Sequence, residues 1–342
     1  MRIVPLFAFL LVVVPSASGQ SSSPADTTQQ SLALAHKDLE QGQQAEAIAL
    51  LQKLAAIHPP VKGLQHELGI AYYRTGKLLE AQRAFAGAIQ EDSSDAESVQ
   101  MQGLTLYRLG RPADAIPYLE RVRQWTPNSN ADANYVLGLC YMNAQRYDDA
   151  RRAFATGFKV NPDSGAAYLL LGSMLQRANL EEFAAIQAQK ALQLAPNLPL
   201  AHFLLGEVYL FKSDVDHALQ EFEKERLLNP GYAPVYDRLG DVYTRTDRLQ
   251  DAQEALTKAI SLDTSSTGSF IQMGKVLLRR QDPVSSIMYL KHAEKMDPAN
   301  FITHTLLAQA YRKVGQEDEA KQEMEMASKI HVENQLKLQP IE

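Results

Sequence analysis

Cysteine is nearly absent from this sequence, which has 342 residues and a single cysteine, Cys140. One cysteine can form neither an intramolecular disulfide nor a zinc site built on cysteine ligands. Its neighbours Gly138, Leu139 and Tyr141 fit a helical pattern. We therefore expect Cys140 to be a small buried side chain without a chemical role.

The sequence also lacks runs of basic residues. It has 34 lysines and arginines against 40 aspartates and glutamates, which gives a net charge of −6. A nucleic acid would need a row of cations on the protein to neutralise its phosphates. Nucleic acid is therefore not an expected partner.

Motifs of known catalytic sites are missing as well. There is no glycine-rich phosphate loop and no Gly-x-Ser-x-Gly turn, and no two of the eight histidines have the spacing of a helical zinc protease. The sequence predicts no catalytic residue, no metal site and no cofactor, so we do not expect an enzyme. An unrecognised site among Glu207, Asp237 and Asp241 is the enzymatic alternative, although their spacing supports no acid–base pair.

A single long apolar run lies near the start, over residues 3–14. Arg2 precedes it, and the small residues Ala17 and Gly19 suit a cut before Gln20. The run is shorter than the roughly 20 residues of a membrane-spanning helix. We predict a signal peptide over residues 1–19 and an exported chain, periplasmic or secreted, without a transmembrane span in its mature part. A retained membrane anchor is the alternative.

Two further segments differ from the rest of the chain in composition. Residues 20–27 are rich in Gln, Ser and Thr, which predicts a flexible linker. Residues 333–342 follow the last predicted helix pair, and we expect a capping helix or tail there.

Between these segments the sequence repeats. Small residues recur every 34 residues, with one spacing of 35, at Gly69, Gly103, Gly138, Gly172, Gly206, Gly240, Gly274 and Ala308. A second small residue follows twelve positions after each, and in most units a large apolar residue lies four positions further on, as Phe85 and Phe222 do. The fifth unit has Ala188 at that place. The pattern predicts pairs of helices in close contact.

The turn inside each unit has its own signal. One phase of the repeat is occupied by Gly42, Gly76, Gly110, Asn179, Asp247 and Gly315. Glycine and asparagine favour the left-handed conformation that ends many helices. Each unit is therefore predicted to be a helix, a tight turn and a second helix.

These motifs resemble the tetratricopeptide repeat. A leucine and glycine followed by a tyrosine recur, as in Leu205, Gly206 and Tyr209, before the alanine and the large apolar residue. The resemblance covers residues 28–332 and implies an all-α fold, a right-handed α-α superhelix of about nine repeats. The repeats would start near residues 28, 62, 96, 131, 165, 199, 233, 267 and 301.

The resemblance also implies a concave groove lined by the first helix of each repeat. In the third to sixth units the groove positions form an apolar row: Leu104, Tyr107, Tyr135, Leu139, Met142, Leu169, Leu200, Phe203 and Leu210. An exposed row of this kind would bind a partner peptide or protein. The alternative is that neighbouring helices bury it. Further along, Asp241 lies four residues before Arg245, and an ion pair accounts for both without a ligand.

A series of cations recurs near the end of the first helix of each repeat: Arg74, Arg108, Arg177, Arg245, Arg279 and Lys313. Cations in a last turn complement the helix dipole, which needs no partner. The alternative is an edge that holds an acidic ligand. The lysine and asparagine of the family's carboxylate clamp are absent, so we do not predict capture of a chaperone's acidic C-terminus.

Two functions follow as hypotheses. The first is a non-enzymatic scaffold for protein–protein interaction, in the cell envelope or outside the cell, that binds a partner in the concave groove. The second is an assembly factor of an envelope, secretion or polysaccharide-export complex that contacts partners through convex or edge surfaces. Fold alone does not separate them.

Overall fold

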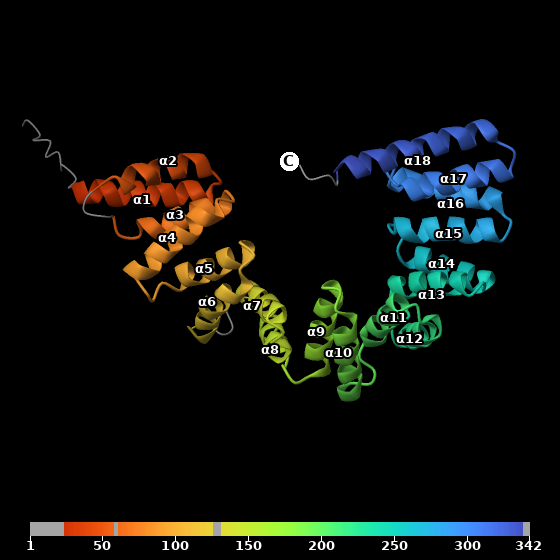
Figure 1. Ribbon diagram of the computed structural model, residues 1–342, viewed down its shortest axis with the longest axis horizontal. Helices are drawn as coiled ribbons and strands as arrows, with labels where there is room; N and C mark the ends of the chain where they lie inside the picture. The colour runs from red at the N-terminus through yellow and green to blue at the C-terminus, as the bar shows by residue number, and fades with distance from the viewer. Residues whose placement is uncertain (1–23, 58–60, 126–130, 338–342) are drawn as a thin grey trace, which may run out of the picture. The chain divides into compact units, whose positions relative to one another are not determined.

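The computed structural model describes residues 24–57, 61–125 and 131–337, and these residues form 18 α-helices and no strand (Figure 1). The helices alternate between an A helix and a B helix. The A helices are α1 (Pro24–Glu40), α3 (Leu64–Arg74), α5 (Ala96–Arg108), α7 (Ala131–Asn143), α9 (Gly165–Arg177), α11 (Ala201–Phe211), α13 (Ala233–Arg245), α15 (Thr267–Arg279) and α17 (Phe301–Lys313). The B helices are α2 (Gln44–Ala55), α4 (Leu78–Glu91), α6 (Pro112–Trp125), α8 (Tyr147–Gly157), α10 (Glu181–Leu194), α12 (Val215–Leu228), α14 (Leu249–Leu262), α16 (Pro283–Met296) and α18 (Glu317–Lys337).

The chain divides into two compact units, Met1–Pro127 and Asn128–Glu342. The first contains α1–α6 and the second contains α7–α18. Within each unit, every A helix packs on the B helix that follows it, and that B helix packs on the next A helix. The predicted all-α array of helix pairs is confirmed.

The ends of the array compare with the sequence predictions as follows. Helix α1 begins at Pro24, so residues 24–27, predicted as part of a flexible linker, are helical. Helix α18 continues to Lys337, into the segment predicted as a capping helix or tail. The predicted signal peptide, residues 1–19, lies outside the described residues.

Each helix pair is closed by a residue in the left-handed conformation. The predicted glycines have φ between +73° and +79°, and Asn179 and Asp247 have φ of +55° and +59°. Gln145, Ser213 and Gln281 fill the same place in the remaining turns, although side chains other than glycine disfavour it. At the start of many helices, a side-chain oxygen accepts hydrogen bonds from backbone N–H groups of the first turn. These acceptors belong to Asp95, Ser164, Asp214, Ser266, Asp282 and Asn300.

In most helix pairs, the repeat glycine of the A helix lies against the large apolar residue of the B helix. A Cβ atom added to Gly206 would lie 2.5 Å from the ring of Phe222, sixteen residues on, and one added to Gly138 would lie 2.5 Å from Phe154. The fifth pair differs, because Ala188 replaces the large residue. There a Cβ on Gly172 would instead meet Leu204 of the next pair at 2.9 Å. A neighbouring repeat thus fills the space that Ala188 leaves.

Candidate functional site

The predicted apolar row is distributed over both units. Leu104 and Tyr107 lie half-buried on α5 in the first unit, and the remaining members belong to the second unit. Leu139, Leu169 and Leu210 are also half-buried. Leu169 packs against a buried cluster formed by Ala188, Leu204 and Leu205.

Several members of the row pack inside the stack. The ring of Tyr135 lies 5.7 Å from that of Phe154, and Phe203 lies 5.6 Å from Phe222 and 5.2 Å from Tyr232. Met142 is 7% exposed. Internal packing therefore accounts for part of the row, which was the alternative left open by the sequence. Leu200, by contrast, is 38% exposed.

Three of the six members of the cation series join successive A helices. Arg74 donates to the carbonyl of Leu39, and Arg279 donates to that of Thr244. Arg108 donates to the carbonyl of Tyr73 at 3.3 Å, with its guanidinium 4.6 Å from the ring centre. In each case the acceptor lies in the last turn of the preceding A helix, where carbonyls lack helical partners. Lys313 contacts Gln281 at 3.2 Å. These contacts link neighbouring repeats and need no ligand, and they are additional to the predicted interaction with the helix dipole.

Arg177 and Arg245 behave differently. Arg245 forms an ion pair with Asp241 at 2.9 Å, as the sequence predicted. Among the described residues Arg177 has no hydrogen-bond or ion-pair partner. The position halfway between them, where the 34-residue period would place a cation, is Phe211. Its side chain is 67% exposed. The arginine link between A helices is thus replaced at α11 by an exposed aromatic ring.

A pocket of about 500 Å³ opens at this interruption. We call it the α11 pocket, and it is lined by Gln176, Arg177, Asn179, Glu181, Glu207, Leu210, Phe211, Arg238, Asp241 and Arg245. These residues come from the last turn of α9, the turn that follows it, the first residue of α10, the second half of α11, and α13. It therefore combines one residue of the predicted apolar row, Leu210, with two of the predicted cationic edge, Arg177 and Arg245.

Two of the three arginines in the α11 pocket are already paired. Arg238 Nε lies 2.6 Å from Glu207 Oε1, and Arg245 is paired with Asp241. Arg177 and Glu181 remain as one charge of each sign beside Phe211. The pocket can thus bind an apolar side chain together with a charged or polar neighbour.

Sequence reasoning did not identify Gln176, Asn179, Phe211 and Arg238 as members of one site. Phe211 carried a usable signal, because it lies 34 residues after Arg177 and 34 before Arg245. A large apolar residue in a cationic series at the end of a helix is unexpected on electrostatic grounds. Asn179 was recognised only as a turn residue, and Gln176 and Arg238 carry no such signal in the sequence.

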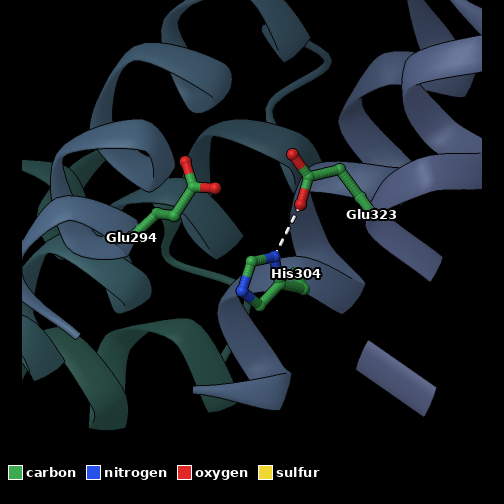
Figure 2. A group of neighbouring side chains, drawn as sticks. All are labelled: Glu294, His304 and Glu323. Carbon is green, nitrogen blue, oxygen red and sulfur yellow. Dashed lines mark hydrogen bonds and ion pairs between the residues drawn. The ribbon is translucent and has the colours of Figure 1, made fainter. Parts of the chain in front are cut away.

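A second cluster, Glu294, His304 and Glu323, brings three potential ligand atoms within 4.8 Å of one another (Figure 2). A lysine already supplies the positive charge there, because Lys291 Nζ lies 2.8 Å from Glu323 Oε1 and 2.9 Å from Glu294 Oε2. His304 Nδ1 lies 2.6 Å from Glu323 Oε2. The cluster is therefore an ion-pair network that ties α16, α17 and α18 together, and we assign no metal to it.

The carboxylates of the enzymatic alternative hold structural contacts. Glu207 and Asp241 pair with arginines of α13, and Asp237 accepts hydrogen bonds from Ser269 at 2.8 Å and Gln272 at 3.2 Å. Glu207 thus joins α11 to α13 and Asp237 joins α13 to α15, whereas the Asp241–Arg245 pair lies within α13.

Cys140 is buried, with no exposed surface, and burial raises the pKa of its thiol to about 12. The expectation of a small buried side chain is confirmed. A thiol with so high a pKa is a poor nucleophile at neutral pH.

The repeated pairs of helices define this chain as a helical-repeat protein. Comparison with known sequences shows which family of repeat proteins it belongs to. Profiles described as Tetratricopeptide repeat match residues 66–130, 106–175 and 233–266. The chain belongs to the tetratricopeptide-repeat proteins. This membership gives it a role in protein–protein interaction, and proteins of the family are typically non-enzymatic scaffolds.

Curated relatives are distant and mostly longer. The chain is 20% identical over 269 residues to "Anaphase-promoting complex subunit 3" of Schizosaccharomyces pombe, which covers 79% of this chain and 40% of that protein. It is 25% identical over 207 residues to "Peroxisomal targeting signal receptor" of Kluyveromyces lactis, which covers 58% and 36%. The chain thus spans less than half the length of either relative.

Solved structures with a similar arrangement include that of pilF from Pseudomonas aeruginosa, at 19% identity and a TM-score of 0.47, over 56% of this chain and 88% of that one. Another is the crystal structure of MamA, at 22% identity and a TM-score of 0.45, over 48% and 95%. In the part of the chain that the structure describes, no helix has the length and apolar character needed to cross a membrane.

Proposed function

We propose that this chain is a scaffold that holds a segment of a partner protein in the α11 pocket. The observation that carries the proposal is Phe211, a ring that is 67% exposed at a place where three other repeats use an arginine to join their A helices. A large apolar side chain so exposed at the mouth of a pocket is typical of a surface that a partner covers.

The chemistry of the pocket indicates what the partner presents. Phe211 and Leu210 would cover an apolar side chain, and Arg177 would pair with a carboxylate beside it. The amide side chains of Gln176 and Asn179 can both donate to and accept from a peptide backbone. We therefore propose an extended segment in which an acidic residue neighbours an apolar one. Exposed members of the predicted row, such as Leu200, would extend this contact.

We further propose that the chain is exported and acts in the periplasm or outside the cell. The support is the sequence of residues 1–19, in which Arg2, an apolar run and small residues follow one another as in a signal peptide. Removal of this segment would leave a mature chain beginning at Gln20.

The assembly-factor hypothesis has its own supporting feature. On the B helix α16, Val284 is 63% exposed and Met288, one turn further on, is 69% exposed. An exposed apolar pair on a B helix would suit a partner bound away from the α11 pocket.

A crosslinking pull-down from the native envelope fraction tests the proposal. The full chain is compared with Phe211→Ser and Arg177→Ala, and with Leu227→Ser as a matched control, because Leu227 is 73% exposed on α12 and outside the pocket. We expect a partner that the parent and the control capture and that both pocket variants lose.

Capture by all forms, at unchanged yield, would contradict the role of the α11 pocket. Loss in a Val284→Ser variant alone would favour the assembly-factor hypothesis. The mass of the recovered chain tests the export proposal in the same experiment, because it reports whether residues 1–19 have been removed.

A further inference from the structure

His304 on α17 occupies a position that a tyrosine fills in an earlier repeat. The hydroxyl of Tyr236 on α13 donates to the carbonyl of Pro230 at 3.0 Å, and Nε2 of His304 lies 3.0 Å from the carbonyl of Pro298. In both repeats the acceptor lies six residues before the donor. His304 thus makes the tyrosine's hydrogen bond and has a second ring nitrogen left over.

That second nitrogen fixes the charge of the ring. A carbonyl oxygen can only accept, so Nε2 carries a hydrogen. Nδ1 lies 2.6 Å from a carboxylate oxygen of Glu323, and a contact this short needs a hydrogen between the two atoms. Glu323 also accepts a hydrogen bond from the ammonium of Lys291 at 2.8 Å. The arrangement is therefore satisfied by an imidazolium that donates from both nitrogens.

The charge of His304 is coupled to the docking of the last helix. Glu323 belongs to α18, whereas Lys291 and Glu294 belong to α16 in the preceding repeat. Among the described residues, Glu323 and Glu294 are the carboxylates that face His304 from the neighbouring helices (Figure 2), and Lys291 pairs with both of them. If His304 lost a proton, one ring nitrogen would present a lone pair to an acceptor, and in the tautomer that keeps the bond to Pro298 this lone pair would face the carboxylate at 2.6 Å. Glu323 would have to move away, and its contact with Lys291 across the repeat boundary would weaken.

An equivalent pair elsewhere lacks this coupling. His202 and Glu221, 102 residues earlier, lie 2.5 Å apart in α11 and α12. At the places that correspond to Lys291 and Glu294, the preceding B helix carries Gln189 and Leu192. That pair is therefore confined to one repeat, whereas the later one spans two.

We propose that His304, Glu323 and Lys291 form a pH-sensitive latch that holds the last helix pair on α16 when His304 is protonated and loosens it as the pH rises. The proposal is independent of the α11 pocket and of any partner there. Because each repeat of a solenoid is stabilised by its neighbours, a latch at the last boundary acts on the terminal pair without unfolding the rest.

The direction of the effect follows from proton linkage. Burial alone would lower the pKa of His304, but the hydrogen bonds to Glu323 and Pro298 outweigh it and raise the pKa above its ordinary value of 6.5. A group whose pKa is raised by folding stabilises the folded state fully below the ordinary pKa. That stabilisation is lost as the pH rises through the pKa of the folded state.

Hydrogen exchange of the α18 amides in the full chain, corrected for the intrinsic pH dependence, tests the latch. Protection of residues 317–337 should fall as the pH rises above 6.5, by about tenfold for each unit by which folding raises the pKa of His304. His304→Tyr keeps a donor for Pro298 and cannot titrate in this range, so its protection should be flat. His292→Gln, an exposed histidine of α16, should behave as the parent does.

Protection that is independent of pH in the parent, or that falls equally in His304→Tyr, would overturn the proposal. If that variant does not fold, an NMR titration of the His304 ring in the unmodified chain decides the matter. A ring that titrates above 6.5 supports the latch, and one that titrates at or below 6.5 overturns it.

Discussion

At the scale of single residues, the repeat glycines leave no room for a side chain. A Cβ on Gly206 would lie 2.5 Å from the ring of Phe222, which is fully buried. Alanine is otherwise the better helix former by about 1 kcal/mol. The free-energy cost of this clash should exceed the gain in helix propensity, because a close-packed interior deforms little to make room for an added atom.

We expect Gly206→Ala to lower the free energy of unfolding by about 1–3 kcal/mol. Gly268→Ala is the matched control, because it also lies in a helix and the nearest atom to its added Cβ is 4.0 Å away. That change should stabilise the chain by up to about 1 kcal/mol. Urea titrations followed by circular dichroism compare the two. Equal losses of unfolding free energy in the two variants would show that backbone effects, and not the contact with Phe222, determine the cost at position 206.

The sequence alone predicted which glycines these are, because their period is visible without any structure. It could not predict that Leu204 fills the space at Gly172, since that contact comes from a different repeat. Phe211 shows the same limit. Its phase is evident in the sequence, but its exposure depends on the last turns of α9, α11 and α13, which no local pattern reveals.

At the scale of an element, the start of α11 depends on a buried carboxylate. Leu200, just before the helix, has φ of +70°, and its N–H donates to Glu225 Oε1 at 2.8 Å. The N–H of Phe203 donates to the other oxygen at 3.3 Å. Glu225 is fully buried on α12. One side chain therefore satisfies two N–H groups that the helix itself cannot.

We expect Glu225→Ala to cost about 2–3 kcal/mol, because two N–H groups would lose a fully buried carboxylate as their acceptor. Glu91 accepts from the N–H of Gly63 at 3.1 Å in a similar way before α3, but it is exposed. Glu91→Ala should cost less than about 1 kcal/mol, since water can replace the carboxylate. Urea titrations and hydrogen exchange at α11 and α3 measure both. Equal costs would contradict the role of burial.

Turn chemistry was predictable from the sequence in six helix pairs, where Gly, Asn or Asp stands at the left-handed position. It was not predictable at Gln145, Ser213 and Gln281, whose residue types do not favour that conformation. The helices on either side impose the turn there. Tertiary packing overrides local preference at these places.

At the scale of the whole molecule, the order of the helices follows directly from the 34-residue period, and the all-α fold was predicted correctly. The pocket was not predicted, because it arises where the period is interrupted. A repeat reports the features that its units share, whereas a binding site depends on the features by which neighbouring units differ. The α11 pocket combines one apolar and two cationic positions that the sequence assigned to separate surfaces.

The central claim is that a partner contacts the α11 pocket at Phe211, and site-specific photocrosslinking tests it most directly. A photoreactive phenylalanine analogue is placed at position 211 in the full chain, and in a second chain at position 227 on α12. Both side chains are largely exposed, at 67% and 73%. We predict a crosslinked partner from position 211 and none from position 227. Crosslinks of equal yield from both positions, or from position 227 alone, would contradict the account.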